Sequence, residues 1–124
     1  MTVKIRIAMI IAATLPTSVL AEEFTCTYRW SGKSENHPML IEINGDHAVT
    51  KGGYLNSKFR VIENSHDELI TIQTNTKKNS GKEYPVGASL IVVDKATQKM
   101  VRSNTHTDES FNGHAVGTCS VVLK

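Results

Sequence analysis

The two cysteines of this 124-residue chain, Cys26 and Cys119, constrain its fold more than any other feature. Each lies in a run where apolar and polar side chains alternate, residues 24–30 near the start and residues 113–124 at the end. Such alternation is typical of half-buried β-strands and places each cysteine on the apolar face. A bond between positions 26 and 119, which are 93 residues apart, would tie the first strand to the last. The sequence therefore predicts a closed β-fold with one disulfide, Cys26–Cys119.

The first residues have the features of a secretory signal peptide. Lys4 and Arg6 give a positive start, an apolar run follows, and Ala21 is a small residue suited to cleavage. The apolar run is shorter than the roughly 20 residues of a helical bilayer span, and no other run approaches that length. We therefore expect residues 1–21 to be removed and residues 22–124 to form one domain, periplasmic or secreted, with no membrane span.

The charge of the mature chain is balanced. Removing Lys4 and Arg6 leaves equal numbers of basic and acidic residues, so the basic isoelectric point belongs to the predicted signal peptide. Nucleic-acid and anionic-membrane binding rest on a surplus of positive charge. The sequence therefore predicts no nucleic-acid partner.

Period-two alternation recurs along the rest of the chain, in short runs separated by Gly, Asn, Asp and Ser. This pattern predicts an all-β domain of about eight strands, and that count suits a small antiparallel up-and-down β-barrel. A β-sandwich is the alternative. The disulfide favours the barrel, because joining the first and last strands suits a fold in which they also pair. The expected strands are residues 24–30, 39–43, 47–50, 58–63, 68–73, 88–93, 99–103 and 113–124.

Four local features carry more specific expectations. Asn44-Gly45-Asp46 predicts a tight hairpin, because Asn-Gly accepts positive φ angles. Residues 88–93 are apolar at nearly every position, which predicts a strand that is buried on both faces or central in the sheet. Gly117 indicates a bend or a close approach of two strands. Residues 74–83 form the longest polar stretch and are expected to be a projecting loop.

A hydrolytic site is the alternative function that the sequence offers. His106, Asp108 and Ser110 are the residue types of a catalytic triad. All three lie in one expected loop, where the geometry between a nucleophile and its base is hard to hold. We therefore expect the protein not to be an enzyme.

No cofactor or metal site is expected either. The sequence has no phosphate-binding loop and no dinucleotide fingerprint. His66 stands beside Asp67 and Glu68 in an expected turn, which is a weak cation-binding pattern. The simpler interpretation is a solvated turn, so we predict no metal and no cofactor.

The polar stretch contains the motif Ser80-Gly-Lys-Glu-Tyr84. This Ser-Gly-x-x-Tyr pattern is similar to the loop motif of the periplasmic lysozyme inhibitors, small secreted β-barrels that insert the loop into the lysozyme cleft. The resemblance implies that Ser80 and Tyr84 contact the catalytic carboxylates of lysozyme, with Lys82 adding charge complementarity. The lysine- and glycine-containing segment that usually follows the motif in these inhibitors is absent from residues 85–94.

The chain also resembles small uncharacterised secreted proteins of proteobacteria. The likeness rests on Cys26 near the mature start, Gly117-Thr-Cys119 near the end and the turn Asp94-Lys-Ala-Thr97. It implies no particular activity.

The function expected from the sequence is therefore a non-enzymatic β-barrel that binds an unknown ligand, with a lysozyme inhibitor as the alternative. A protein partner in the envelope would contact the polar stretch. The candidate contact residues are Lys77, Lys78, Ser80, Gly81, Lys82 and Tyr84.

Overall fold

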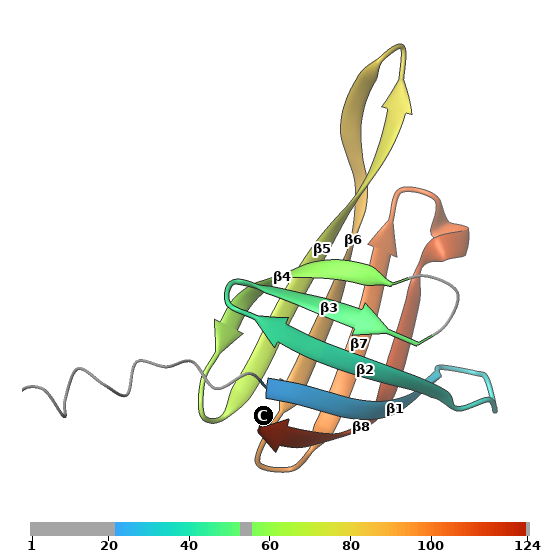
Figure 1. Cartoon of the computed structure of the whole chain (residues 1–124). Coiled ribbons are helices and arrows are strands. Elements are labelled where there is room, and N and C mark those ends of the chain that lie inside the picture. Colours follow the sequence, from blue (N-terminus) through green and yellow to red (C-terminus); the bar gives the residue numbers. More distant parts are fainter. Residues whose placement is uncertain (1–21, 53–55, 124) are drawn as a thin grey trace, which may run out of the picture.

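Hydrogen bonding between neighbouring strands follows the order of the chain from β1 to β8, and β8 pairs back with β1 (Figure 1). All neighbours are antiparallel, so the computed structural model, which describes residues 22–52 and 56–123, is a closed eight-stranded up-and-down barrel. The predicted barrel is confirmed, and the predicted signal peptide lies outside the described residues. The strands are β1 Glu22–Trp30, β2 His37–Asn44, β3 His47–Lys51, β4 Ser57–Asn64, β5 Glu68–Asn79, β6 Lys82–Asp94, β7 Lys99–His106 and β8 Gly113–Leu123, with a 3-10 helix η2 at Glu109–Phe111.

Alternation along the strands builds the core. In β1, Phe24, Cys26 and Tyr28 are buried while the residues between them are exposed. The same pattern in the other strands sends one apolar face inward. Burying each large side chain, such as Phe24 or Phe59, contributes about 1.5–3 kcal/mol.

The pairing of β1 with β8 closes the barrel and carries the predicted disulfide. Cys26 and Cys119 are direct register partners with Cα atoms 4.0 Å apart, and their sulfur atoms are bonded. At one end of the same pairing, Glu22 lies opposite Leu123, so the ends of the described chain lie side by side (Figure 1). The close approach expected at Gly117 is confirmed, because a Cβ atom there would overlap the Thr27 carbonyl oxygen.

The barrel interior changes character along its axis. Near the chain ends the inward-facing residues are apolar, among them Phe24, Ile41 and Val93. Toward the opposite end the inward positions of β6 and β7 carry Ser89 and Asn104, which are register partners. The interior is therefore mainly apolar, with polar positions at Ser89 and Asn104 toward one end and at Thr50 and Thr71 along the wall.

Lys95 closes the apolar end. Its Nζ atom lies 3.1 Å from Glu22 Oε2, 2.7 Å from Asn64 Oδ1 and 5.7 Å from the centre of the Phe24 ring. Asn64 Nδ2 donates to the other Glu22 oxygen at 2.8 Å. These contacts join β1, the end of β4 and the turn after β6.

The expectations for β5 and β6 hold only in part. Residues 88–93 are central in the sheet, because β6 pairs with a strand on each side. They are not buried on both faces: Ile91 and Val93 face the core, whereas Leu90 is 37 % exposed on the outer surface. Residues 74–83 are not a loop either, because β5 continues to Asn79 and β6 begins at Lys82. The hairpin expected at Asn44-Gly45-Asp46 is confirmed, with Gly45 at φ 63°.

Candidate partner-binding site

The far end of the β5–β6 hairpin forms an arm, residues 76–85, that extends beyond the barrel wall (Figure 1). A register shift after Asn75 separates the arm from the part of the hairpin that belongs to the barrel. The arm ends in a two-residue turn in which Ser80 and Gly81 both have positive φ angles, 54° and 78°. Positive φ at both central positions matches the right-handed twist of the paired strands, which makes this turn a regular hairpin connection.

Strand pairing sorts the side chains of the arm onto two faces. Lys77 lies opposite Tyr84, and Asn79 lies opposite Lys82, so these four residues share one surface, here called the basic face. No carboxylate stands among the four. The other face pairs Lys78 with Glu83.

The acidic residue of the arm, Glu83, therefore lies on the face away from Tyr84, and its carboxylate is hydrogen-bonded there. Glu83 lies opposite Lys78 and accepts a hydrogen bond from Thr76 Oγ1. Of the predicted contact residues, the structure brings Lys77, Lys82 and Tyr84 together. It places Lys78 on the opposite face and Ser80 and Gly81 at the tip.

A cleft of about 440 Å³ lies between the base of the arm and the connection from β7 to β8. Lys77, Tyr84 and Val86 line it from the arm side, and His106, Asp108 and Phe111 line it from the connection. The Phe111 ring is 63 % exposed and lies 5.0 Å from the His106 ring, centre to centre.

The cleft has a fixed base. Thr107 donates a backbone hydrogen bond to the Val86 carbonyl at 2.8 Å, which ties the connection to β6. The sequence did not indicate this cleft, because His106 and Phe111 lie more than 20 residues from the motif along the chain. An isolated aromatic residue in a polar loop was the one available signal.

The three residues of the suspected triad do lie together, but not in triad order. His106 Nδ1 accepts a hydrogen bond from the Asp108 backbone N–H at 2.9 Å. The Ser110 hydroxyl donates to Asp108 Oδ1 at 2.8 Å and not to the imidazole. In a hydrolytic triad the imidazole stands between the hydroxyl and the carboxylate. Here Asp108 instead caps η2 by accepting from the Ser110 backbone N–H at 3.1 Å.

These hydrogen bonds set the protonation of Asp108. The Ser110 hydroxyl and then its backbone N–H stabilise the carboxylate, so the pKa of Asp108 lies below its ordinary value. The residue is an ionised structural cap at neutral pH.

The suspected cation site lies in the turn between β4 and β5. His66 Nδ1 lies 3.2 Å from Asp67 Oδ1, and both side chains are almost fully exposed. The Glu68 carboxyl shares a hydrogen bond with Glu63, which raises the pKa of Glu68. Within residues 22–52 and 56–123 no three metal-ligating side chains come together.

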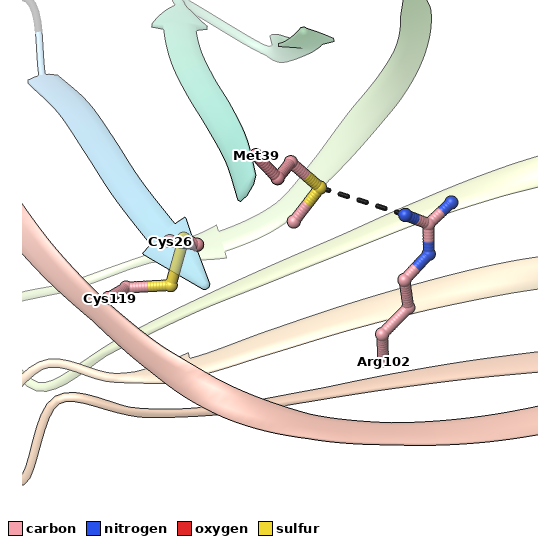
Figure 2. The surroundings of a disulfide bond; sticks show 4 residues. All are labelled: Cys26, Met39, Arg102 and Cys119. Atoms are coloured by element: carbon pink, nitrogen blue, oxygen red, sulfur yellow. Dashed lines mark hydrogen bonds between the residues drawn. A yellow bond between two sulfur atoms is a disulfide. The ribbon is translucent and has the colours of Figure 1, made fainter. Parts of the chain in front are cut away.

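The disulfide lies inside the barrel, on β1 and β8 (Figure 2). Both cysteines are almost fully buried, and no other cysteine exists in the chain. A buried, formed disulfide suggests an oxidising, extracytoplasmic compartment. The part of the chain that the structure describes contains no helix of the length and apolar character needed to cross a bilayer.

Comparison with known proteins does not assign the chain to a family. No protein-family model matches the sequence, and no curated protein matches it. What the molecule itself establishes is an eight-stranded antiparallel β-barrel with one disulfide.

Proposed function

We propose that this protein is a non-enzymatic binding protein of the periplasm or the extracellular space, and that it docks a partner protein on the basic face of its arm. The observation that carries the proposal is the arm itself. It is a paired β-ribbon that projects from a rigid barrel and presents Lys77, Lys82 and Tyr84 on one surface. Binding residues commonly lie on such projections from a rigid scaffold.

The chemistry of the basic face selects an acidic partner. Lys77 and Lys82 attract and orient a negatively charged surface, and Asp108 on the other side of the cleft offsets part of the charge of Lys77. Tyr84 offers apolar area together with a hydroxyl, and the exposed Phe111 ring faces the same cleft. Aromatic side chains of this kind are common anchors in protein interfaces. The partner that fits carries a carboxylate cluster beside an apolar projection.

A lysozyme is the specific partner that we propose. The cleft of a lysozyme holds two carboxylates, and the two-residue turn of the arm is the part that would enter it first. Ser80 then leads at the tip, and Tyr84 follows on the basic face. The likeness of Ser80-Gly-x-x-Tyr84 to the motif of periplasmic lysozyme inhibitors supports the same partner.

The test is inhibition of several lysozyme types by the mature protein. Ser80→Ala and Tyr84→Ala should each weaken inhibition, and Lys77→Glu with Lys82→Glu should abolish it. Lys78→Glu is the matched control for Lys77→Glu alone, since each reverses one charge; Lys77→Glu should weaken inhibition, whereas Lys78→Glu, on the opposite face, should leave it nearly unchanged. Circular dichroism would confirm that each variant is folded.

Two outcomes would reject the lysozyme proposal or its site. Absence of inhibition for every lysozyme type would reject the partner. Inhibition that is equally sensitive to Lys78→Glu and to the change at Lys77 and Lys82 would reject the basic face as the docking surface.

We further propose that the protein has no catalytic activity of its own. The His106 imidazole is engaged by the backbone, and the Ser110 hydroxyl is bonded to the carboxylate. A screen with esterase and peptidase substrates should therefore be blank. Hydrolysis that disappears in His106→Ala would show the opposite.

A further inference from the structure

The outer surface of four neighbouring strands, β5 to β8, is aliphatic. Figure 1 shows β5, β6 and β7 running side by side on one wall of the barrel. Inward positions of these strands hold buried residues such as Leu69, Ile91 and Met100, so the alternate positions face outward. Strand register sets the outward aliphatic side chains in two adjacent rows, here called the aliphatic face: Ile70, Val92, Val101 and Val116 in one row, and Ile72 and Leu90 in the next.

The barrel alone does not explain the aliphatic face. Val101 and Val116 are 38 % and 51 % exposed, although each lies beside other aliphatic side chains. β6 is apolar at consecutive positions, and such a strand is typical of a sheet that is covered on both sides. A contiguous apolar surface on a soluble protein marks a place of contact with another molecule.

An apolar projection flanked by acidic residues stands on the β4 side of the aliphatic face. Ile62 lies at the β-bulge between Val61 and Glu63, and its side chain is 53 % exposed. Glu63 shares a hydrogen bond with Glu68, and this bond and the repulsion between the two groups raise the pKa of Glu68. Neither glutamate belongs to an ion pair among the described residues. This side therefore combines an apolar knob with acidic groups that lack a cation.

A hollow of about 600 Å³ flanked by basic residues lies on the other side, over β7, β8 and β1. Val101 and Val116 line it, together with Arg29 and Lys99. Lys99 lies near enough to Asp94 to attract that carboxylate, whereas Arg29 has no ion pair in the part of the chain that the structure describes. This side therefore combines an apolar hollow with a cation that lacks an anion.

We propose that two copies of this protein associate through the aliphatic face, so that Ile62 of each copy enters the hollow of the other. Knob and hollow lie on the same rows, because Glu63 is the register partner of Ile70 and Arg29 is the register partner of Val116. A two-fold axis along β6 and β7 exchanges the two sides and keeps the rows, which gives the self-complementary contact of a symmetric dimer. Glu63 of one copy then meets Arg29 of the other.

The charges and shapes on the molecule select a second copy as the occupant. Acid and base, and knob and hollow, stand on one chain at matching positions, so no different protein has to supply them. The contact does not use the arm. Because the arm continues β5 and β6, an axis along these strands leaves both arms on the same side of the dimer, where they could engage a partner together.

Sedimentation velocity of the mature protein over a wide range of concentrations tests the contact. The parent should approach twice the monomer mass as its concentration rises. Val116→Lys places a charge in the apolar contact and should weaken association about a hundredfold or more. Val122→Lys is the matched control, since Val122 is an outward valine of the same strand, 48 % exposed, that lies outside both rows. It should associate like the parent.

An exchange of charges tests the two-fold arrangement. Glu63→Arg alone sets arginine against arginine in both contacts of the dimer, and Arg29→Glu alone sets glutamate against glutamate. Both positions are exposed, so each variant should fold and should associate about tenfold more weakly than the parent. An equal mixture of the two variants should regain the association of the parent, because both contacts of the mixed dimer again join opposite charges.

Three results would overturn the proposal. They are a folded parent that is monomeric at every concentration, which would leave the face to a different protein, equal association of Val116→Lys and the parent, and a mixture that is as monomeric as either charge variant. If circular dichroism shows that Val116→Lys fails to fold, Ile62→Lys replaces it at the exposed knob. Association of that variant at the strength of the parent would equally contradict the contact, and weakened association would support it.

Discussion

Two residues other than glycine have left-handed backbone angles, Ser80 at φ 54° and Gln98 at φ 64° within the described chain. A side chain with a Cβ atom is strained in this region. At Gln98 the conformation is fixed by its neighbours, because its carbonyl oxygen accepts a hydrogen bond from the Cys119 backbone N–H at 2.8 Å. The turn between β6 and β7 therefore holds its strain next to the disulfide.

Replacing Gln98 by glycine should relieve this strain. We expect Gln98→Gly to raise the free energy of unfolding by about 0.5–1 kcal/mol, which is the relief of the left-handed angle less the entropy that glycine adds to the unfolded chain. Denaturant unfolding measures the change. Lys99→Gly, in the adjacent strand, is the control and should destabilise the barrel. A loss of stability in Gln98→Gly would contradict the assignment of strain.

The hydrogen bonds from Ser110 should make the stability of the folded protein depend on whether Asp108 is ionised. Because its folded pKa lies below the ordinary value of 3.8, Asp108 contributes stability above that pH and loses the contribution as the pH falls through the folded pKa. In Ser110→Ala the first and larger cause is removed, so the pKa of Asp108 should rise toward 3.8. Carbon-13 NMR titration measures both values.

The carboxyl of Asp46 serves as the control in the same titration. Its pKa is lowered chiefly by the hydrogen bond with His47 and has no contribution from Ser110. Its midpoint should be the same in both proteins. An unchanged midpoint for Asp108 would show that the Ser110 hydroxyl does not stabilise the carboxylate.

At the scale of the elements, the strands with one buried face were predictable and the arm was not. Residues 24–30 alternate between core and solvent, so their pattern follows from burial. The arm is exposed on both faces, so nothing in Lys77-Lys78 or Lys82-Glu83 alternates in hydrophobicity. Main-chain pairing and the Ser80-Gly81 turn hold it as a ribbon, and neither leaves a periodic signal in the sequence.

The arm should be separable from the barrel. All of its side chains are exposed, so replacing residues 78–83 by Asn-Gly removes no core contact and leaves Lys77 paired with Tyr84 next to the new turn. We expect the β-type circular dichroism spectrum to be retained and the melting temperature to change by only a few degrees, while partner binding is lost. A variant that fails to fold would show that the arm supports the barrel.

At the scale of the whole molecule, closure of the barrel was predictable from the positions of the cysteines, whereas the polar positions inside it were not. Arg102 lies two residues after Met100, so the two side chains are on the same face of β7. Because Met100 is buried in the core, Arg102 also points into the barrel. The sequence alone does not show which arginine of a strand has neutral neighbours on the strands beside it. This information depends on register across the sheet, which only the folded structure supplies.

Opening the disulfide should destabilise the whole domain. The bond closes a loop of 93 residues, and its removal from a small secreted domain costs about 2–5 kcal/mol. We expect Cys26→Ser with Cys119→Ser to lower the melting temperature by about 10 °C or more. The parent protein should show no free thiol under denaturant before reduction. Equal melting temperatures with and without the bond would contradict this expectation.

The side-by-side position of Glu22 and Leu123 allows the connectivity of the domain to be rearranged. Paired strands lie about 5 Å apart, so a short linker can join these two positions and new ends can be opened at another turn. The same proximity allows residues 22–123 to be inserted as a cassette into a surface loop of a host protein. Because both junctions lie at the end of the barrel away from the arm, the host would hold the arm pointing outward into the medium (Figure 1).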